Sequence, residues 1–584
     1  MKQSADLKRL LASIDHKSYP AYKDVRGAYD FNTYILSIDH VQGDPFASPS
    51  KVSVQIRHTK AGFPAELFDT PWKKTALEDY LLRCFSREIG RLSFKAKGSG
   101  KSGLIATSRP GQEVLSRTAC EIGKNEITAR FEVGFPAFGR TINSGELIRI
   151  FFDFLPGCVE SVFFYRRQNT AEIKKRITLA DDQQFIRNEL KRLDLVSFVA
   201  DGSILPRETG VSDRPMKGSV AFHSPDSLRI TLNLPGHGPI SGMAIRRGIT
   251  LIVGGGYHGK STLLKALESG VYNHIPGDGR EYVITDETAV KLRAEDGRSI
   301  NHVDISLFIR DLPNKKDTTC FSTADASGST SQAAAVIESI EAGTRAFLID
   351  EDTSATNFML RDDLMQRIVS RDKEPITPFI ERARDLYKQA GISTVLVAGS
   401  SGAYFFIADT IIQMDAYRPF DITEMVKNAC EQELSKPAIQ APGFKLPTAG
   451  RKLAAGGTGR AVGAMALNFG DSRAEAGRNS DRNTRIKVRV HDKHSFQVAK
   501  EPVDLRFVEQ LADSEQTAAL AQMVRYCLEK GLLERCTVQE TVATLLKAYE
   551  TGGLSVFSDA SYAAMGLAMP RVQEIYACLN RFRG

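Results

Sequence analysis

The chain has 584 residues, of which 42% are hydrophobic and 25% charged, and it carries a formal net charge of +7. This length predicts three or four domains, and the composition excludes a disordered or fibrous protein. The eight cysteines are scattered without a CxxC pair or a metal-like spacing, which argues against a disulfide scaffold or a zinc site and favours a reducing cytoplasmic or nuclear setting.

The N-terminus carries charges throughout and lacks the apolar core of a signal peptide. No later stretch approaches the ~18 apolar residues that a membrane span requires. We therefore expect a cytoplasmic protein with no membrane part.

Residues 1–195 predict an N-terminal α+β domain without a chemical motif of its own. Short β-like runs alternate there with helical stretches such as residues 71–88. The runs expected as strands are residues 34–41, 51–57, 127–133, 147–152 and 162–165. Residues 98–102, Gly-Ser-Gly-Lys-Ser, look like half of a phosphate loop, but no apolar strand precedes them, so we expect a mobile basic loop.

Residues 249–267, ITLIVGGGYHGKSTLLKAL, form the most informative segment of the chain. An apolar strand runs into a glycine-rich loop and then directly into a helix, which is the order of a P-loop. Backbone amides of such a loop grip phosphates, Lys260 reaches the β and γ oxygens, and the Ser261 hydroxyl holds Mg²⁺. The predicted ATP-binding residues here are Gly254, Gly255, Gly256, Tyr257, His258, Gly259, Lys260, Ser261 and Thr262, with no catalytic role for Tyr257 and His258.

A second apolar strand ends in two acids, Asp350 and Glu351. A phosphate loop needs a carboxylate for Mg²⁺ and a group that activates water, and these two acids can supply both. Asp350 is predicted to hold Mg²⁺ together with Ser261, and Glu351 to polarise the attacking water. Ser327-Gly328-Ser329 stands 23 residues before Asp350 and opens a helical run at residues 331–341. A serine and amides at a helix start can grip a γ-phosphate.

These elements, in this order, resemble the ABC ATPases, whose signature Ser-Gly-Gly precedes the Walker B acid by a similar distance. The stretch after the acids, Asp352-Thr353-Ser354-Ala355-Thr356-Asn357, resembles the D-loop of that family. The resemblance implies that Ser327, Gly328 and Ser329 of one copy face ATP held by a second copy, so that a homodimer shares the nucleotide. The sequence departs from the family pattern in four ways. Asp352 replaces the usual proline, and Ser329 replaces the second signature glycine. No glutamine occurs between Ser261 and Gln332, and residues 399–402 lack the switch histidine, for which Ser400 is the candidate replacement.

Residues 445–500 hold twelve Lys and Arg against four Asp and Glu, so the remainder of the chain is close to neutral. Much of this segment is rich in Gly, Ala, Ser and Asn, which predicts a flexible linker. Two interpretations stay open, a solvated linker and a contact with RNA or another polyanion. Beyond the linker we expect a strand at residues 485–490 and amphipathic helices at residues 504–531 and 537–549.

The whole pattern is similar to the family described as predicted ATPases of the ABC class. The stretches that carry the likeness are VQGDPFA at residues 41–47, GGGYHGKSTLL, ASGSTSQAA, LIDEDTSATNFM and VEQL at residues 508–511. The resemblance implies an α/β fold with an N-terminal α+β domain (1–195), an ABC-type P-loop core (196–435), a basic linker (436–484) and a small C-terminal α+β domain (485–584). It further implies a Mg²⁺-dependent ATPase that moves its flanking domains, with links to RNA in some members.

Two other functions stay open. The missing glutamine and switch histidine are compatible with an ATP-gated nucleic-acid-binding or scaffold protein that turns over little ATP. The ATPase subunit of a membrane transporter fits less well, because long extra domains flank the core at both ends.

Overall fold

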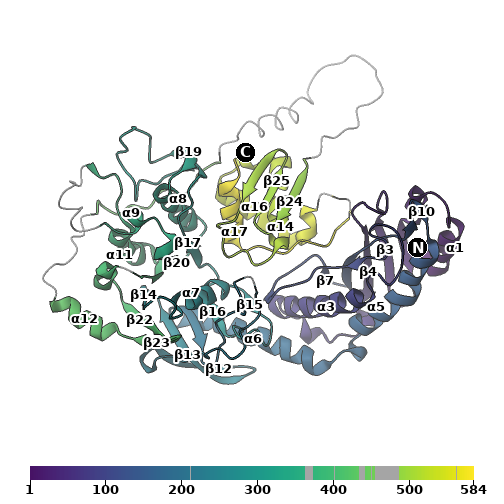
Figure 1. Ribbon diagram of the computed structural model, residues 1–584, viewed down its shortest axis with the longest axis horizontal. Helices are drawn as coiled ribbons and strands as arrows, with labels where there is room; N and C mark the ends of the chain where they lie inside the picture. The colour runs from purple at the N-terminus through teal and green to yellow at the C-terminus, as the bar shows by residue number, and fades with distance from the viewer. Residues whose placement is uncertain are drawn as a thin grey trace, which may run out of the picture. The chain divides into compact units, whose positions relative to one another are not determined.

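The computed structural model describes residues 1–210, 212–361, 373–399, 401–432, 441–448, 450–453, 486–558, 560 and 562–583 (Figure 1). The chain forms two compact units. The first comprises Met1–Asp181 and Gly552–Met569, and the second comprises Asp182–Thr551 and Pro570–Gly584. The domain limits expected from the sequence stay a prediction.

The first unit combines a mixed sheet with helices. Its strands are β1 Lys2–Gln3, β2 Gly27–Asp30, β3 Ile35–His40, β4 Ser50–Arg57, β5 Ile105–Ala106, β6 Glu113–Val114, β7 Cys120–Ile122, β8 Glu126–Val133, β9 Ala137–Phe138 and β10 Thr141–Ile142. Its helices are α1 Ser4–Ser13, α2 His58–Ala61, α3 Pro71–Leu92, α4 Ser144–Ile148 and α5 Leu155–Phe163, and α6 Thr170–Arg192 crosses into the second unit.

The core of this unit lies between its sheet and α3 and α5. The strand order is β1-β2-β3-β4-β8-β5, with β7 also paired to β8. Every second residue of β8 is buried, as expected for a strand with one face on the core. The Phe85 ring of α3 packs edge-on against Phe131 of β8, with 5.5 Å between the ring centroids. It also packs in a tilted arrangement against Phe163 of α5, at 5.2 Å between centroids.

Two of the strands predicted in this unit are wrong. Residues 147–152 lie in α4 and in the π-helical turn Arg149–Phe154 that follows it. Residues 162 and 163 are the last two of α5, and residue 165 begins the 3-10 turn that follows that helix. Residues 162–165 are continuously apolar, and Arg149 is the one polar residue in 147–152; short apolar runs of this kind do not distinguish a strand from a helix.

The expectation of a mobile basic loop at residues 98–102 is also wrong. The Ser99 amide donates to the Ala137 carbonyl at 2.7 Å, and the Lys101 amide donates to the Pro45 carbonyl at 2.8 Å. These hydrogen bonds tie the backbone of the loop to two other segments.

The second unit contains the remaining elements. Its strands are β11 Leu195–Ala200, β12 Arg229–Leu234, β13 Gly238–Arg246, β14 Ile249–Val253, β15 Asn273–His274, β16 Val283–Thr285, β17 Val290–Leu292, β18 Arg298–Val303, β19 Phe321–Ala326, β20 Ala346–Asp350, β21 Ser393–Val397, β22 Thr410–Asp415, β23 Arg418–Asp421, β24 Val488–Asp492, β25 Ser495–Val498 and β26 Glu501–Asp504. Its helices are α7 Lys260–Ser269, α8 Gly328–Glu341, α9 Thr356–Met359, α11 Phe379–Ala390, α12 Thr423–Gln432, α14 Ser514–Glu529, α15 Leu532–Arg535, α16 Val538–Gly552 and α17 Val572–Arg581.

A six-stranded sheet of order β17-β20-β21-β14-β22-β23 organises this unit, and all its pairs except β22 with β23 are parallel. Strands β20 and β21 are buried along their whole length, as is typical of parallel strands covered on both faces. This unit also contains an antiparallel sheet of order β12-β13-β11-β16, the antiparallel pair β18-β19 and a three-stranded sheet β24-β25-β26. The parallel sheet and the helices of this unit confirm the predicted α/β class.

The C-terminal elements start later than the sequence suggested. The helix predicted from residue 504 begins at Ser514, because Asp513 accepts a hydrogen bond from the Glu515 amide and forms a capping box with Gln516. The strand expected at residues 485–490 is β24, Val488–Asp492, and residue 485 lies outside the described part of the chain. None of the described helices combines the length and the apolar character needed to cross a bilayer.

Candidate nucleotide site

The carboxyl ends of three neighbouring parallel strands define one edge of the large sheet. Val397 of β21 pairs with Ile252 of β14 on one side and with Asp350 of β20 on the other. The two outer strands therefore end at the same level, about 10 Å apart. The Ala398 amide donates to the Ile252 carbonyl at 3.0 Å and extends this alignment beyond the strands. Ligands of open α/β sheets bind outside this edge.

The loop after β14 needs glycine at two positions. Gly254 has a φ of 139°, and a Cβ atom there would lie 2.3 Å from the Met414 carbonyl oxygen. Gly259 has a φ of 98°, and its Cβ would lie 2.8 Å from the Tyr417 ring. Side chains rarely adopt such backbone conformations. The loop therefore lies closely on the turn between β22 and β23, and α7 begins directly after it at Lys260.

Lys260 lies across its own loop. Its Nζ donates to the carbonyl oxygens of Gly254 at 2.7 Å and Gly255 at 2.8 Å. Ser261 follows in the first turn of α7 and is exposed, so its hydroxyl is accessible at the positive end of the helix dipole. These placements match a loop that grips phosphates.

His258 anchors the loop, a role the sequence did not indicate. Its Nδ1 lies 2.8 Å from Asp415 Oδ1 and 3.0 Å from the Ala416 amide, and its carbonyl accepts from the Tyr417 amide at 3.1 Å. When Nδ1 carries a proton it can donate to the Asp415 carboxylate, and when it does not it can accept from the Ala416 amide. The neighbouring Tyr257 has a fully exposed side chain and a φ of 64°.

The two predicted acids differ in their surroundings. Asp350 is 9% exposed, and its Oδ1 accepts from the Asp352 amide at 3.2 Å. Glu351 is half-buried, and its Oε2 accepts from the Gly399 amide at 2.8 Å, which places its carboxylate beside the end of β21. Burial raises the pKa of the nearby Tyr404 hydroxyl well above its usual value, and the charge of Glu351 adds to this effect.

The predicted signature residues open α8. Ser327 is exposed, and its Oγ lies 3.0 Å from Thr330 Oγ1 and 3.4 Å from Ser329 Oγ. Ser329 is 8% exposed and therefore turned into the protein. A Cβ on Gly328 would lie 3.3 Å from Ala294 Cβ, which leaves little room for a side chain. Among the described residues, no hydrogen bond or ion pair joins Ser327, Gly328 or Ser329 to the loop of residues 254–262.

Gln332 is a site residue that sequence reasoning missed. It is fully buried in α8; its Nε2 donates to Ser354 Oγ at 3.0 Å and its Oε1 accepts from the Ala355 amide at 2.9 Å. Ser354 Oγ in turn donates to the Asp350 carbonyl at 2.9 Å. In the sequence, Gln332 is a lone amide residue directly before an apolar run, which indicates that it is buried. A buried amide requires hydrogen-bond partners, and this requirement was the available signal.

Residues 290–298, which we term the connector, link the site to the rest of the unit. The Ala294 amide donates to the Thr353 carbonyl at 3.0 Å, in the stretch after the acids. The Glu295 amide donates to Ser331 Oγ of α8 at 2.9 Å. Arg298 pairs with Glu338 of the same helix, and both side chains are almost fully buried. The connector therefore contacts both segments expected to face a second nucleotide.

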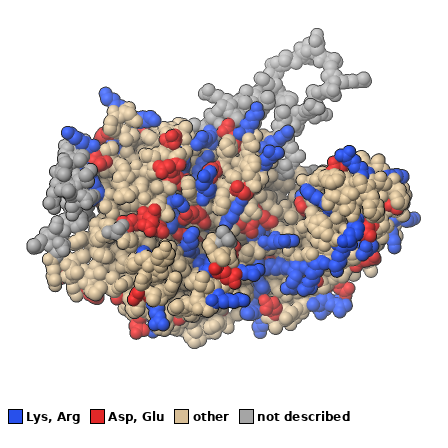
Figure 2. All heavy atoms as spheres, in the orientation of Figure 1, with Lys and Arg blue, Asp and Glu red and all other residues tan. Residues whose placement is uncertain are grey.

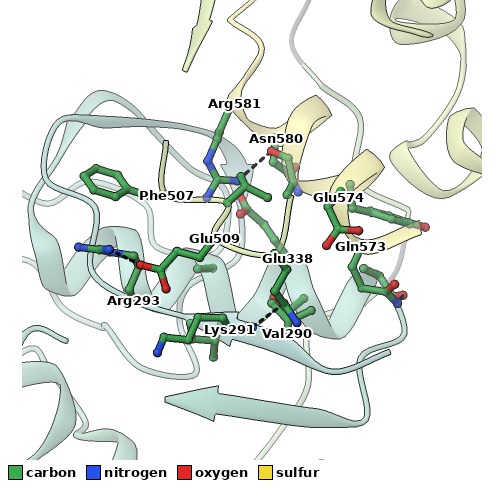
Figure 3. Close-up of a pocket in the computed structure, with 18 of the residues that line it drawn as sticks. Val290, Lys291, Arg293, Glu338, Phe507, Glu509, Gln573, Glu574, Asn580 and Arg581 are labelled. Carbon is green, nitrogen blue, oxygen red and sulfur yellow. Dashed lines mark hydrogen bonds and ion pairs between the residues drawn. The ribbon is translucent and has the colours of Figure 1, made fainter. Parts of the chain in front are cut away.

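The connector also contacts the C-terminal elements, around a cavity of about 50 Å³ lined by β17, α8, α17 and residues 507–510 (Figure 3). Arg293 pairs with Glu509 at 2.5 Å, and Arg581 of α17 pairs with Glu295. Burial raises the pKa of Glu295, but the charges of Arg581 and Arg298 outweigh it and hold this pKa below its usual value.

Gln510 fastens the VEQL stretch to the phosphate-loop helix. Its Nε2 donates to the Glu268 carbonyl at the end of α7 at 3.1 Å, and its Oε1 accepts from the Lys291 amide at 2.9 Å. Lys291 and Glu268 form a buried ion pair at 2.8 Å. The end of α7, the connector and the C-terminal elements are thus joined by direct bonds.

Some predicted residues lie outside the described part of the chain. These are Ser400 and residues 454–485, the greater part of the basic segment. Among the described residues, no three of His, Cys, Asp and Glu gather as a metal site. A Mg²⁺ held by the Ser261 hydroxyl, Asp350 and phosphate oxygens would not need such a cluster, and these oxygen donors suit that ion.

Three family models match the chain in sequence order. The N-terminal domain of ATPases of the ABC class matches residues 4–166, the P-loop domain of the ABC ATPases matches residues 169–445, and the MRB1590 C-terminal domain matches residues 487–584. The uncharacterized protein MJ1628 of Methanocaldococcus jannaschii is 31% identical over 229 residues, which is 38% of this chain and 50% of that protein. The chain thus spans about half the length of this curated relative.

Solved structures give weaker likenesses. The ADP conformation of MJ1267, an ATP-binding cassette of an ABC transporter, is 13% identical to this chain, with a TM-score of 0.23. The match covers 33% of this chain and 88% of the MJ1267 chain. For cbiO1 of Clostridium perfringens, part of the transporter complex cbiONQ, the identity is 13%, the coverage 41% and 92%, and the TM-score 0.26.

Proposed function

The chain belongs to the ATPases of the ABC class, and on that premise we propose that it hydrolyses ATP at the carboxyl edge of its large sheet and couples this to its flanking elements. The observation that carries the proposal is the register of β14, β21 and β20, which aligns the phosphate loop with Asp350 and Glu351. The ends of β14 and β20, on either side of β21, thus supply phosphate-binding groups and acids to one edge of the sheet.

Each residue at this edge has a distinct task. The Lys260 ammonium exchanges its two carbonyl partners for phosphate oxygens. Ser261 and Asp350 would hold Mg²⁺, which neutralises phosphate charge when it is bound. Glu351, oriented by the Gly399 amide, polarises the attacking water. The close packing of Gly254 and Gly259 keeps the loop in its phosphate-binding shape.

We further propose that two copies share the nucleotide, since ABC ATPase domains generally dimerise. Ser327 is exposed at the start of the 14-residue helix α8, and its side chain does not cap the backbone amides of the first turn. A helix start is an anion site, so this end of α8 suits the γ-phosphate of ATP on a partner copy. The buried Ser329 is better suited to support the turn than to touch phosphate.

The connector supports coupling to the C-terminal elements. It bonds to the stretch after the acids through Ala294, to α8 through Glu295, and to α17 through the pair of Glu295 with Arg581. A shift of α8 on engaging phosphate would therefore reach α17 through Glu295, whose backbone amide bonds to α8 and whose side chain pairs with Arg581 of α17. RNA or another polyanion is the partner that we propose to bind at residues 445–500. Within that segment Arg451 already forms an ion pair with Glu341 at 2.6 Å.

Steady-state phosphate release tests the enzymatic half. We expect Glu351→Gln to lower kcat by about 100-fold or more, because it removes the group that polarises water. Lys260→Ala should abolish ATP binding. Asp352→Asn is the matched control, since this exposed acid adjoins Glu351 but receives no catalytic task, and we expect its kcat to stay within about 2-fold of the wild type. Equal turnover in the Glu351 and Asp352 variants would refute the assignment.

A second function, an ATP-gated binding protein with little turnover, is favoured by one feature. The Glu351 carboxylate is already engaged by the Gly399 amide, in a strand end that lacks the switch histidine of the family. In that case the wild type would bind ATP but release phosphate no faster than Glu351→Gln. Binding of a fluorescent ATP analogue, measured beside turnover, separates the two functions.

A further inference from the structure

The nucleotide site makes no use of the cavity of about 50 Å³ that lies within the second unit (Figure 3). The connector and α8 form one part of its wall, and residues 507–510 and α17 form the other. A single water needs roughly 10–15 Å³ of space for its centre. The cavity therefore has room for a group of about four non-hydrogen atoms.

One polar group on the wall of this cavity is a donor without a partner. Asn580 of α17 is fully buried and lines the cavity. Its Oδ1 accepts from the Arg451 guanidinium at 2.6 Å. Because a guanidinium only donates, the side-chain oxygen must face Arg451, and the Nδ2 amide then faces away from it. Among the described residues, no acceptor engages this Nδ2.

A second polar group on the wall is an acceptor without a partner. Glu338 of α8 lines the cavity, and 6% of its side chain is exposed. Its Oε2 pairs with Arg298, whereas nothing in the described part of the chain donates to its Oε1. Arg298 and Arg451 both lie outside the cavity wall, so the unpartnered ends of Glu338 and Asn580 are the ones left for the cavity.

These two groups lie close together. One nitrogen of the Arg451 guanidinium donates to Glu341 of α8 and to Asn580 of α17, at 2.6 Å in each case. Glu338 precedes Glu341 by one turn of α8, and side chains at this spacing are neighbours on one helix face, about 5–6 Å apart at Cβ. An occupant of the cavity can therefore reach Glu338 Oε1 and Asn580 Nδ2 at the same time.

The wall of the cavity carries no uncompensated charge. Its ionised side chains all have a partner of opposite sign, in the pairs Glu295–Arg581, Glu509–Arg293, Glu574–Arg571, Lys291–Glu268 and Glu338–Arg298. Figure 2 shows acidic and basic side chains mixed over the visible side of the C-terminal elements. A neutral occupant is favoured, because an ion would be buried there without a counter-charge.

We propose that this cavity binds a small neutral molecule through a primary carboxamide group. The amide nitrogen donates to Glu338 Oε1 and the amide oxygen accepts from Asn580 Nδ2, so that each unpartnered group gains the bond it lacks. A bound amide joins α8 directly to α17, beside the link through Glu295. The site depends neither on the proposed ATP hydrolysis nor on a polyanion.

Saturation-transfer NMR of the full chain with acetamide tests the site, because it detects the methyl group of a ligand that exchanges with the protein. A ligand of this size with both hydrogen bonds can reach a Kd on the order of 1 mM. Acetone and acetate have the same shape, but acetone donates nothing to Glu338 and acetate brings a second negative charge. We expect both to bind about 10-fold or more weakly than acetamide.

Two results of this comparison would overturn the proposal. Equal saturation of the three methyl groups would mean that the hydrogen-bond pattern does not matter. No saturation of acetamide in the wild type would leave the cavity to water alone.

Glu338→Gln tests the assigned contacts. Glutamine keeps an oxygen for Arg298 and turns its amide nitrogen toward the cavity, which then presents two donors. We expect the preference to reverse, with acetate about 10-fold or more tighter than acetamide. Glu534→Gln on α15 removes the same charge at an exposed place away from the cavity and should keep the wild-type preference. An unchanged preference in Glu338→Gln would contradict the assigned contacts.

Ala577→Leu tests the location, because it fills the cavity with an apolar side chain from α17. We expect the saturation of the acetamide methyl group to be lost. The matched control is Ala543→Leu, the same change at an exposed place on α16, which should leave it intact. Thermal unfolding checks that each variant is folded. Undiminished saturation in a folded Ala577→Leu would place the amide elsewhere and overturn the proposal.

Discussion

Replacing Arg581 by Met tests the link between the connector and the C-terminal elements. Arg581 of α17 and Glu295 are 9% and 7% exposed, and the guanidinium also donates to the Ala577 carbonyl at 2.8 Å. Methionine keeps much of the apolar stem but removes the charge. Glu295 then stays buried, with Arg298 and Arg293 as its remaining sources of positive charge.

The size of the effect follows from this burial. Removing one partner of a buried ion pair costs about 3–5 kcal/mol, and the help from Arg298 places our expectation near the lower end. The second unit spans Asp182–Thr551 and Pro570–Gly584, so its entropy of unfolding is large, and a loss of about 3 kcal/mol lowers its Tm by roughly 3–5 °C. Because the Glu295 amide is bonded to Ser331 of α8, we also expect a lower kcat for ATP hydrolysis.

The pH dependence has a definite sign. The folded protein lowers the pKa of Glu295 below its ordinary value of 4.5, so the stability from the pair is fully present above pH 4.5. That stability is lost as the pH falls through the lowered pKa. The difference between the wild type and Arg581→Met should therefore be large at pH 7 and shrink below pH 4.5.

Scanning calorimetry at pH 7 and pH 4 measures both effects. The matched control is Arg506→Met, since Arg506 pairs with Asp504 at 2.8 Å on the surface of the C-terminal elements, with 66% and 54% of the side chains exposed. Exposed pairs contribute little, so we expect the control to shift Tm by about 1 °C at most. If Arg581→Met behaves like this control, the connector does not hold α17 in the way described.

Three further predictions concern other parts of the chain. Burial raises the pKa of Glu78 to about 8, so between its ordinary value of 4.5 and pH 8 the wild type should lose up to about 1.4 kcal/mol of stability per pH unit. Urea unfolding at pH 5, 6.5 and 8 should show this decline in the wild type but not in Glu78→Gln, and parallel curves would contradict it. Gln332→Leu leaves a buried amide without its acceptor, and we expect a loss of about 1–3 kcal/mol with a kcat reduced more than KM; an unchanged kcat would remove Gln332 from the site. Gly259→Ala meets the Tyr417 ring and a left-handed backbone, so ATP binding measured by calorimetry should fall by about 10-fold or more, and wild-type affinity would show that the loop tolerates a side chain.

The local elements of the site could be predicted from the sequence. The phosphate loop occupies contiguous residues between a strand and a helix, and the structure shows β14, the loop and α7 in that order. Asp350 likewise ends a fully buried strand. Each of these features depends on neighbours in the sequence, so a short window contains the information that specifies it.

The contacts between distant segments could not be predicted. Gln332 bonds to Ala355 across 23 positions, and Arg581 pairs with Glu295 across 286, separations over which side-chain type alone does not specify a partner. Periodicity failed at residues 147–152 for a related reason. That run has one polar residue, Arg149, among six, and it is too short to show whether its apolar residues recur with the period of a strand or of a helix.

The mass of Glu351→Gln in solution tests the central claim most directly, because this variant should bind ATP without consuming it. With Mg²⁺ and ATP, light scattering should give about 129 kDa, twice the 64.3 kDa of one chain, and Ser327→Arg in the same background should return the mass to that of one chain. A particle of 64.3 kDa that has bound ATP at full occupancy would contradict a site shared between two copies.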